Sequence, residues 1–117
     1  MRTIIADDYL PFRRLLREFL ACEPEVEFVA EADNGQDTIA KALQLGPDVI
    51  LMDISMPGVP SLEALRVIKT YMPGVKVIVL LDEDNREYRN AALESGASDC
   101  IAKELAARQL PLAMRAL

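Results

Sequence analysis

The sequence predicts an α/β fold, a doubly wound sheet of five parallel strands with helices on both faces. Short apolar runs alternate five times with segments of helical periodicity. The two central runs, at residues 49–52 and 77–81, are continuously apolar, as is typical of strands buried on both faces. The connections are short, and no linker, repeat or low-complexity tract interrupts the alternation. We therefore expect one domain that spans residues 1–117.

The first two strand–helix units occupy the N-terminal part of the chain. A strand at residues 3–6 precedes a helix whose apolar residues fall on one face, with Pro11 suited to its first turn. A strand at residues 26–30 precedes a helix that the turn at Gly46-Pro47 ends. The residues that mark the two helices are Phe12, Leu15, Leu16, Phe19 and Leu20, then Ile39, Ala42 and Leu43.

The third and fourth units follow the same pattern. A strand at residues 49–52 precedes a helix that ends before Pro73, because proline cannot continue a helix. A strand at residues 75–81 precedes a helix that Gly96 ends. The helix-marking residues are Leu62, Leu65 and Ile68, then Tyr88, Ala91, Ala92 and Ser95.

The fifth unit completes the alternation. A strand at residues 100–102 precedes the last helix, in which Pro111 is expected near the start, where a missing N–H costs little. Ligands of doubly wound sheets bind beyond the carboxyl ends of the strands. The residues just past each strand are therefore the candidate site. The last helix is marked by Leu110, Ala113, Met114 and Leu117.

The composition excludes several kinds of site. The chain has no histidine, which excludes His-based triads and His metal ligands, and its net charge of −6 argues against binding nucleic acid or anionic membranes. Cys22 and Cys100 are too few for a disulfide framework or a zinc site, so we expect two buried thiols in a reducing compartment. No apolar run approaches the ~20 residues of a transmembrane helix, and the N-terminus lacks a signal-peptide pattern. A cytoplasmic location is expected.

Charged residues follow the strands at the predicted site. Asp7 and Asp8 come after the first strand, Asp53 ends the third, and Lys103 follows the fifth. The acidic run at residues 82–84 after the fourth strand is interpreted as a solvated loop. Single acidic residues at loop starts are commonly turn or N-cap residues. Their placement at one edge of one sheet is what favours a functional site.

Three carboxylates in close proximity raise one another's pKa values, and a hard divalent cation removes that repulsion. Oxygen ligands without His or Cys select Mg²⁺ or Mn²⁺. A carboxylate can also be a nucleophile that forms an aspartyl phosphate, with the metal and a fixed lysine balancing charge on the phosphoryl oxygens. The pattern therefore points to phosphoryl chemistry.

Four features carry a family resemblance: Ile-Ile-Ala-Asp-Asp at residues 4–8, Leu-Met-Asp-Ile-Ser-Met-Pro-Gly at 51–58, Gly-Ala-Ser at 96–98, and Lys103. Over essentially all 117 residues the chain resembles a response-regulator receiver domain of bacterial two-component systems. Glu87-Tyr88 and residues 96–98 look most like the subfamily with a LuxR-type DNA-binding output domain. The resemblance implies a flavodoxin-like (βα)5 three-layer sandwich.

The resemblance also implies roles for individual residues. Asp53 would accept a phosphoryl group from a sensor histidine kinase, in a reaction that needs Mg²⁺. Asp8, Asp53 and the backbone carbonyl of Ser55 would bind the metal, and Asp7 would reach it through water. Lys103 would pair with Asp53 and later with a phosphoryl oxygen. Such a domain catalyses only its own phosphorylation and dephosphorylation. It binds no nucleic acid or membrane itself, and a homodimer is possible.

Two positions depart from the family pattern. A hydroxyl residue at the end of the fourth strand and an aromatic residue in the fifth are replaced by Leu81 and Cys100. The chain is therefore interpreted as a phosphorylatable receiver with an altered switch, or as a degenerate receiver that acts as a phosphorylation-independent interaction module. A flavin carrier on the same fold is disfavoured, because residues 7–11 after the first strand would repel a phosphate. A small-molecule phosphatase is disfavoured because no loop is long enough to form a covering lid.

Overall fold

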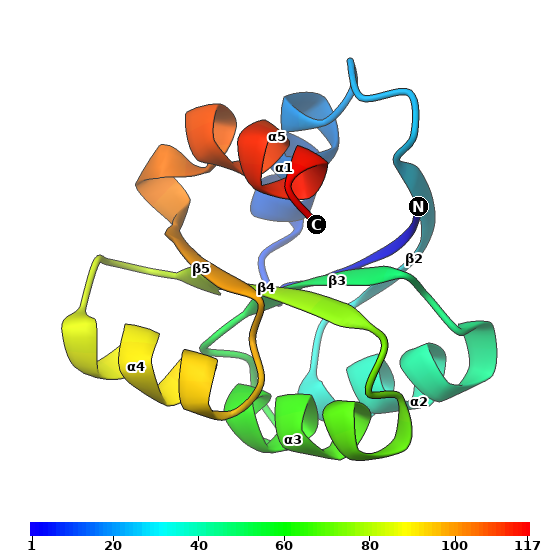
Figure 1. The fold of residues 1–117 in the computed structure, drawn as a ribbon. Coiled ribbons are helices and arrows are strands. Elements are labelled where there is room, and N and C mark those ends of the chain that lie inside the picture. The colour runs from blue at the N-terminus through cyan, green and yellow to red at the C-terminus, as the bar shows by residue number, and fades with distance from the viewer.

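A computed structural model describes residues 1–117 and shows one parallel sheet of five strands in the order β2-β1-β3-β4-β5. Two layers of helices enclose the sheet (Figure 1), which confirms the predicted three-layer α/β fold. No helix combines the length and the apolar character that crossing a bilayer requires. The elements are β1 Arg2–Ala6, α1 Leu10–Phe19, β2 Glu27–Ala32, α2 Gly35–Leu45, β3 Val49–Asp53, α3 Ser61–Tyr71, β4 Lys76–Leu81, α4 Arg86–Glu94, β5 Asp99–Ala102, a 3₁₀ turn Lys103–Leu105 and α5 Ala106–Arg115.

The sheet separates two apolar clusters. Helices α1 and α5 cover one face, and α2, α3 and α4 cover the other (Figure 1). Successive side chains of a strand point to opposite faces, so Ile50 and Met52 of β3 join the cluster under α2–α4, whereas Val49 and Leu51 join the cluster under α1 and α5. This double burial is the physical reason for the continuous apolar runs in the sequence.

The start of α5 differs from the prediction. Pro111 lies inside the helix rather than near its start, because α5 begins at Ala106. Periodicity counted from Leu110 misses this first turn, in which fully buried Ala106 supplies the core contact. Proline removes the N–H that would bond to the carbonyl four residues earlier, that of Ala107, and Ala107 lies at the exposed surface where water can replace it.

The expectation of two buried thiols is right for Cys100 and wrong for Cys22. Cys22 is exposed in the turn between α1 and β2, because α1 ends at Phe19 and the chain makes its last deep core contact at Leu20. Three residues that were used to predict helices also lie at the exposed margins of their apolar stripes. They are Leu15, Leu43 and Tyr88. Leu117, which was expected in the last helix, is also exposed and lies beyond the end of α5 at Arg115.

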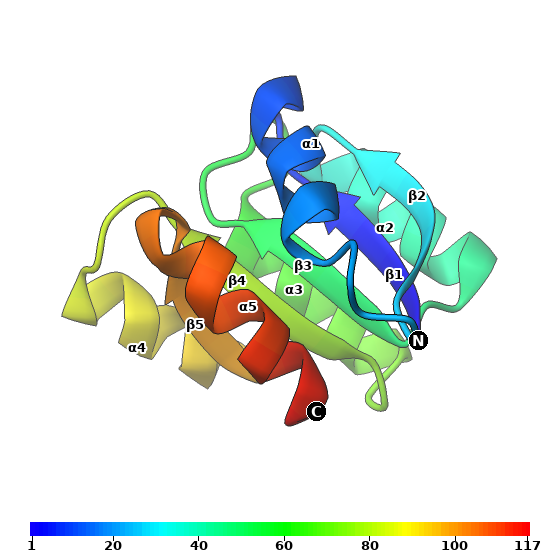
Figure 2. The same ribbon diagram turned by 90° about the horizontal axis from the view of Figure 1, so that it is seen from above.

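The strand order brings the ends of β1 and β3 side by side. The chain leaves β1 for β2 on one side and returns through α2 to β3 on the other side, so β1 lies between them (Figure 2). Ala6 at the end of β1 pairs with Met52 of β3. The residues that follow, Asp7 and Asp53, therefore emerge together at the edge where such sheets bind ligands.

The loop that leaves Asp53 is held against the start of α2. The N–H of Gly35 donates to the carbonyl of Pro57 at 3.3 Å, and the N–H of Val59 donates to the side chain of Gln36 at 2.9 Å. A Cβ at Gly35 would lie 2.0 Å from the carbonyl oxygen of Val59. Only glycine permits this approach, so Gly35 fixes the course of the loop beside the site.

We expect Gly35→Ala to destabilise the domain by about 1–3 kcal/mol, because the added methyl group must displace backbone. Gly74→Ala is the matched control, since a Cβ there meets nothing within 4 Å. Urea unfolding of both variants measures the difference. Equal stability of the two variants would show that the contact between α2 and the loop is not tight.

Candidate functional site

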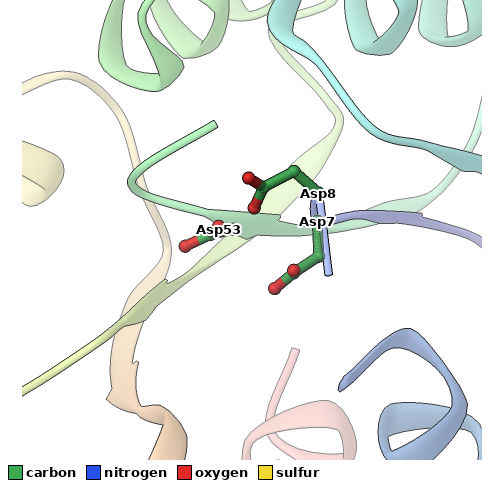
Figure 3. A group of neighbouring side chains, drawn as sticks. All are labelled: Asp7, Asp8 and Asp53. Atoms are coloured by element: carbon green, nitrogen blue, oxygen red, sulfur yellow. The ribbon is translucent and has the colours of Figure 1, made fainter. Parts of the chain in front are cut away.

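Three carboxylates meet at the carboxyl edge of the sheet. Oxygen atoms of Asp7, Asp8 and Asp53 lie within 4.8 Å of one another. Figure 3 shows the Asp7 and Asp8 side chains leaving opposite sides of the chain after β1, with Asp53 extending beside them from the neighbouring strand. Asp7 and Asp53 are buried and Asp8 is exposed. The sequence-predicted acidic residues are therefore together in space.

Asp7 is fixed by its own backbone and by its neighbours. Its N–H donates to the carbonyl of Ala32 at 3.0 Å, and its carbonyl accepts from the guanidinium of Arg13 at 2.6 Å. Carboxylate Oδ1 accepts from the N–H of Tyr9 at 2.8 Å. The other oxygen of this fully buried carboxylate, Oδ2, has the ammonium of Lys103 as its partner, 2.9 Å away.

The Lys103 ammonium lies among three carboxylates. Its Nζ is 2.9 Å from Asp7, 3.3 Å from Asp53 and 3.3 Å from Asp82. The same nitrogen lies 4.8 Å from the centre of the Phe12 ring, within cation–π range. Burial opposes the charge of Lys103, but the carboxylates outweigh it and raise the pKa of the ammonium. Lys103 is therefore a permanent cation at this edge.

The environment of Asp53 disfavours its negative charge. Burial, followed by the charge of Asp7, raises the pKa of Asp53 to about 6, although Lys103 and the N–H of Ser55 act in the opposite direction. The Ser55 N–H donates to Oδ1 at 3.2 Å. Two buried carboxylates thus face one ammonium, and a divalent cation would restore the balance. The oxygen-only donor set fits Mg²⁺.

The structure adds two residues that the sequence analysis did not assign to the site, Asp82 and Phe12. Asp82 was interpreted as part of a solvated loop, and its side chain is 60% exposed, yet it contacts Lys103. Its position directly after β4 is the signal that could have identified it, since the same rule identified Asp53. The periodicity indicates Phe12 only as an apolar residue of the first helix, whereas its ring also faces the ammonium of Lys103.

An open cavity of about 430 Å³ lies over these groups. A water molecule occupies roughly 30 Å³ of liquid, so a hydrated cation and a phosphoryl group both fit. The cavity is lined by Asp8, Tyr9, Phe12, Asp53, Ser55, Asp82 and Lys103.

The two departures from the family pattern are buried beside this site. Leu81 ends β4 and Cys100 lies in β5, and both belong to the apolar cluster under α2–α4. The Cys100 thiol lies 3.7 Å from the carbonyl of Arg89 on α4, and burial raises its pKa to about 11. The thiol is therefore a neutral packing group. The apolar Leu81 side chain has no group that can donate to an anion.

Comparison with known proteins identifies the family of the chain. The response regulator receiver domain model matches residues 3–115. The transcriptional regulatory protein DegU of Brevibacillus brevis is 40% identical over 110 residues, which is 94% of this chain and 47% of that protein. The response regulator VraR of Staphylococcus saprophyticus is 34% identical, over 98% of this chain and 55% of that protein. The chain spans about half the length of these two relatives.

Solved structures share the fold. A LuxR-family two-component response regulator from Aurantimonas sp. SI85-9A1 has a TM-score of 0.92 at 25% identity, covering 98% of this chain and 82% of that one. The response regulator domain of Thermotoga maritima CheB has a TM-score of 0.90 at 30% identity, covering 99% and 94%. The isolated REC domain of Salmonella enterica serovar Typhimurium RcsB, determined with the phosphomimetic BeF₃⁻, gives 0.91 at 28%, covering 99% and 86%. With its family match, its relatives and its fold in agreement, the chain belongs to the receiver domains of two-component response regulators, among relatives of the LuxR type.

Proposed function

We propose that this receiver domain accepts a phosphoryl group on Asp53 from a sensor histidine kinase and thereby controls a response regulator. The observation that carries the proposal is the charge imbalance around Asp53. A buried carboxylate with a raised pKa lies beside a second buried carboxylate and a lysine, in a cavity open to solvent. Such a carboxylate can attack phosphorus once a cation neutralises its surroundings.

The acidic cluster is suited to hold the Mg²⁺ that receiver domains bind. We assign Asp8, Asp53 and the backbone carbonyl of Ser55 as direct ligands, and Asp7 as a ligand through water. The assignment of Asp7 is supported by its carboxylate, which is already engaged by the Tyr9 N–H and by Lys103. When bound, the metal supplies positive charge next to the phosphoryl oxygens.

The transfer step uses one carboxylate oxygen of Asp53. That oxygen forms a bond to phosphorus while the P–N bond to the donor histidine of the kinase breaks. The imidazole leaves with the bonding electron pair and takes up a proton from solvent. Lys103, 3.3 Å from Asp53, then pairs with a phosphoryl oxygen and offsets part of its charge. The domain catalyses only this transfer and the later hydrolysis of its own acyl phosphate.

The relatives indicate the wider role. DegU and VraR are regulators about twice as long as this chain, so we infer that the domain is the input module of a transcription regulator with a LuxR-type output domain. The kinase would meet it in the cytoplasm. The net charge of −6 supports assigning DNA binding to the output domain rather than to this one. A homodimer formed on phosphorylation would suit a regulator of this kind.

A second candidate function rests on Leu81 and Cys100. Neither side chain can perform the hydroxyl and aromatic roles of the family. The domain would then serve as an interaction module that binds its partner independently of phosphorylation. The two candidates differ in whether Asp53 is ever phosphorylated and whether phosphorylation changes the fold.

Asp53→Asn should be more stable than the wild type at pH 8 without metal, by up to roughly 3 kcal/mol for a pKa raised from 3.8 to about 6. The folded state binds a proton on Asp53 below pH 6, whereas the unfolded chain does so only below about 4. The wild type therefore recovers stability between these values, and the difference between the two proteins should shrink as the pH falls. Urea unfolding at pH 8, 6 and 4.5 measures it.

Magnesium provides the control for this prediction. At pH 8, millimolar Mg²⁺ should raise the melting temperature of the wild type, because the cation binds only the folded state. Asp8→Ala should lose most of that rise. An equal rise in Asp8→Ala would remove Asp8 from the metal site.

Phosphorylation itself is tested by mass. After treatment with acetyl phosphate and Mg²⁺, the intact protein should gain one phosphoryl group, and Asp53→Asn should gain none. Labelling of Asp53→Asn would show that another residue is the nucleophile. A wild type that is never labelled would favour the phosphorylation-independent interaction module.

The altered switch predicts a weak conformational response. We expect BeF₃⁻ with Mg²⁺ to shift the amide NMR signals of residues 81–95 and 99–103 less in the wild type than in the double variant Leu81→Thr with Cys100→Tyr. A ligand moves a two-state equilibrium only through contacts that differ between the two states, and Leu81 and Cys100 offer fewer such contacts. The single variant Leu81→Thr is included because the new tyrosine must fit a buried position. No increase in either variant would contradict the assignment of these positions.

A further inference from the structure

Asp82 shares the Lys103 ammonium with the proposed phosphoryl acceptor. Lys103 Nζ is 3.3 Å from Asp53 and 3.3 Å from Asp82. Asp53 is buried in the sheet edge, whereas Asp82 begins the loop between β4 and α4. The Lys103 ammonium thus links the proposed phosphoryl acceptor to the loop of residues 82–85.

The same loop is attached to α4 and β5 by a second ion pair. The guanidinium of Arg89 lies 3.2 Å from Asp84 and donates to the backbone carbonyl of Cys100 at 2.7 Å. Asn85 caps α4 by accepting from the N–H of Tyr88 at 3.1 Å. The loop is therefore held at one end by the site and at the other by α4 and β5.

We infer that Asp82 is a positioning residue that competes with a phosphoryl group on Asp53 for the ammonium of Lys103. The inference rests on the proposed phosphorylation of Asp53. The Asp82 carboxylate can only accept hydrogen bonds. A phosphoryl group carries about two negative charges and replaces the single charge of the Asp53 carboxylate, so phosphorylation adds about one negative charge to the same cavity. Lys103 then turns to the phosphoryl oxygens, and repulsion separates Asp82 from the site.

In this arrangement the loop after β4 moves in the opposite direction on phosphorylation from that expected of a family member with a hydroxyl residue at the end of β4. A hydroxyl at position 81 would draw the loop toward the phosphoryl group, whereas Leu81 offers no donor and Asp82 repels. The loop of residues 82–85 is expelled rather than drawn in. Because Asp84 pairs with Arg89, and Arg89 donates to the backbone carbonyl of Cys100, the displacement reaches α4 and β5 through the Arg89 side chain.

Asp82→Asn tests the competition, because it removes the charge and keeps the size of the side chain. The affinity for BeF₃⁻ at saturating Mg²⁺ should rise roughly three- to tenfold, the range for unit charges a few ångströms apart in water-exposed surroundings. The affinity for Mg²⁺ alone should fall, because one negative charge leaves the cavity. Damage to the fold would lower both affinities. Titrations followed by amide NMR measure each constant.

Two control variants and one further NMR signal make the test specific. Asp84→Asn removes the same charge from the same loop, but the native Asp84 pairs with Arg89 rather than with Lys103. The BeF₃⁻ affinity of this variant should therefore stay within twofold of the wild type. Asp82→Glu should retain wild-type behaviour. The Arg89 side-chain NMR signal should move on adding BeF₃⁻ to the wild type and move less in Asp82→Asn, whose loop is already released.

The outcomes separate this inference from the proposed function. Wild-type protein that binds Mg²⁺ but not BeF₃⁻ would overturn the proposed function and this inference with it. Wild-type binding of BeF₃⁻ with unchanged or weaker binding in Asp82→Asn would overturn the inference alone. Equal gains in Asp82→Asn and Asp84→Asn would show a general effect of net charge and would also overturn it.

Discussion

The site depends on one constraint, the mismatch between two buried carboxylates and a single ammonium. Asp7 and Asp53 are nearly inaccessible to solvent, and Lys103 supplies one positive charge between them. Burial strengthens every electrostatic interaction at this edge, attraction and repulsion alike. The raised pKa of Asp53 and the suitability of the edge for a divalent cation follow from this mismatch, and Asp82 adds to it because it shares the same ammonium.

The fold creates the mismatch by topology. A parallel sheet with β1 between β2 and β3 places the ends of strands that are distant in sequence at one edge. Burial of these charges destabilises the folded state, and the packing of the two apolar clusters on either side of the sheet offsets that loss. A strong core is what allows a destabilising constellation to persist, as is common for reactive sites.

The sequence predicted the sheet, its five helices and the position of the acidic cluster, because each depends on a local pattern. Continuous apolar runs require burial on both faces, and the residue after such a strand must lie at the ligand edge. The start of α5 and the exposure of Cys22 could not be predicted in this way, since a buried alanine and an exposed turn leave no periodic signal. The position of Asp82 after β4 places it at the same edge, but its contact with Lys103 could not be predicted, because an ion pair depends on where two side chains meet in space.

The ion pair between Lys103 and Asp82 joins segments that lead to the two helix layers. Lys103 opens the turn that leads into α5 on one face of the sheet, whereas Asp82 opens the loop that leads into α4 on the other. The intervening sheet keeps the two apolar clusters apart, so a rearrangement in one layer need not disturb the packing of the other. The 3.3 Å ion pair is thus a direct link across the sheet edge between the segment that leads into α5 and the segment that leads into α4, and its opening would remove that link.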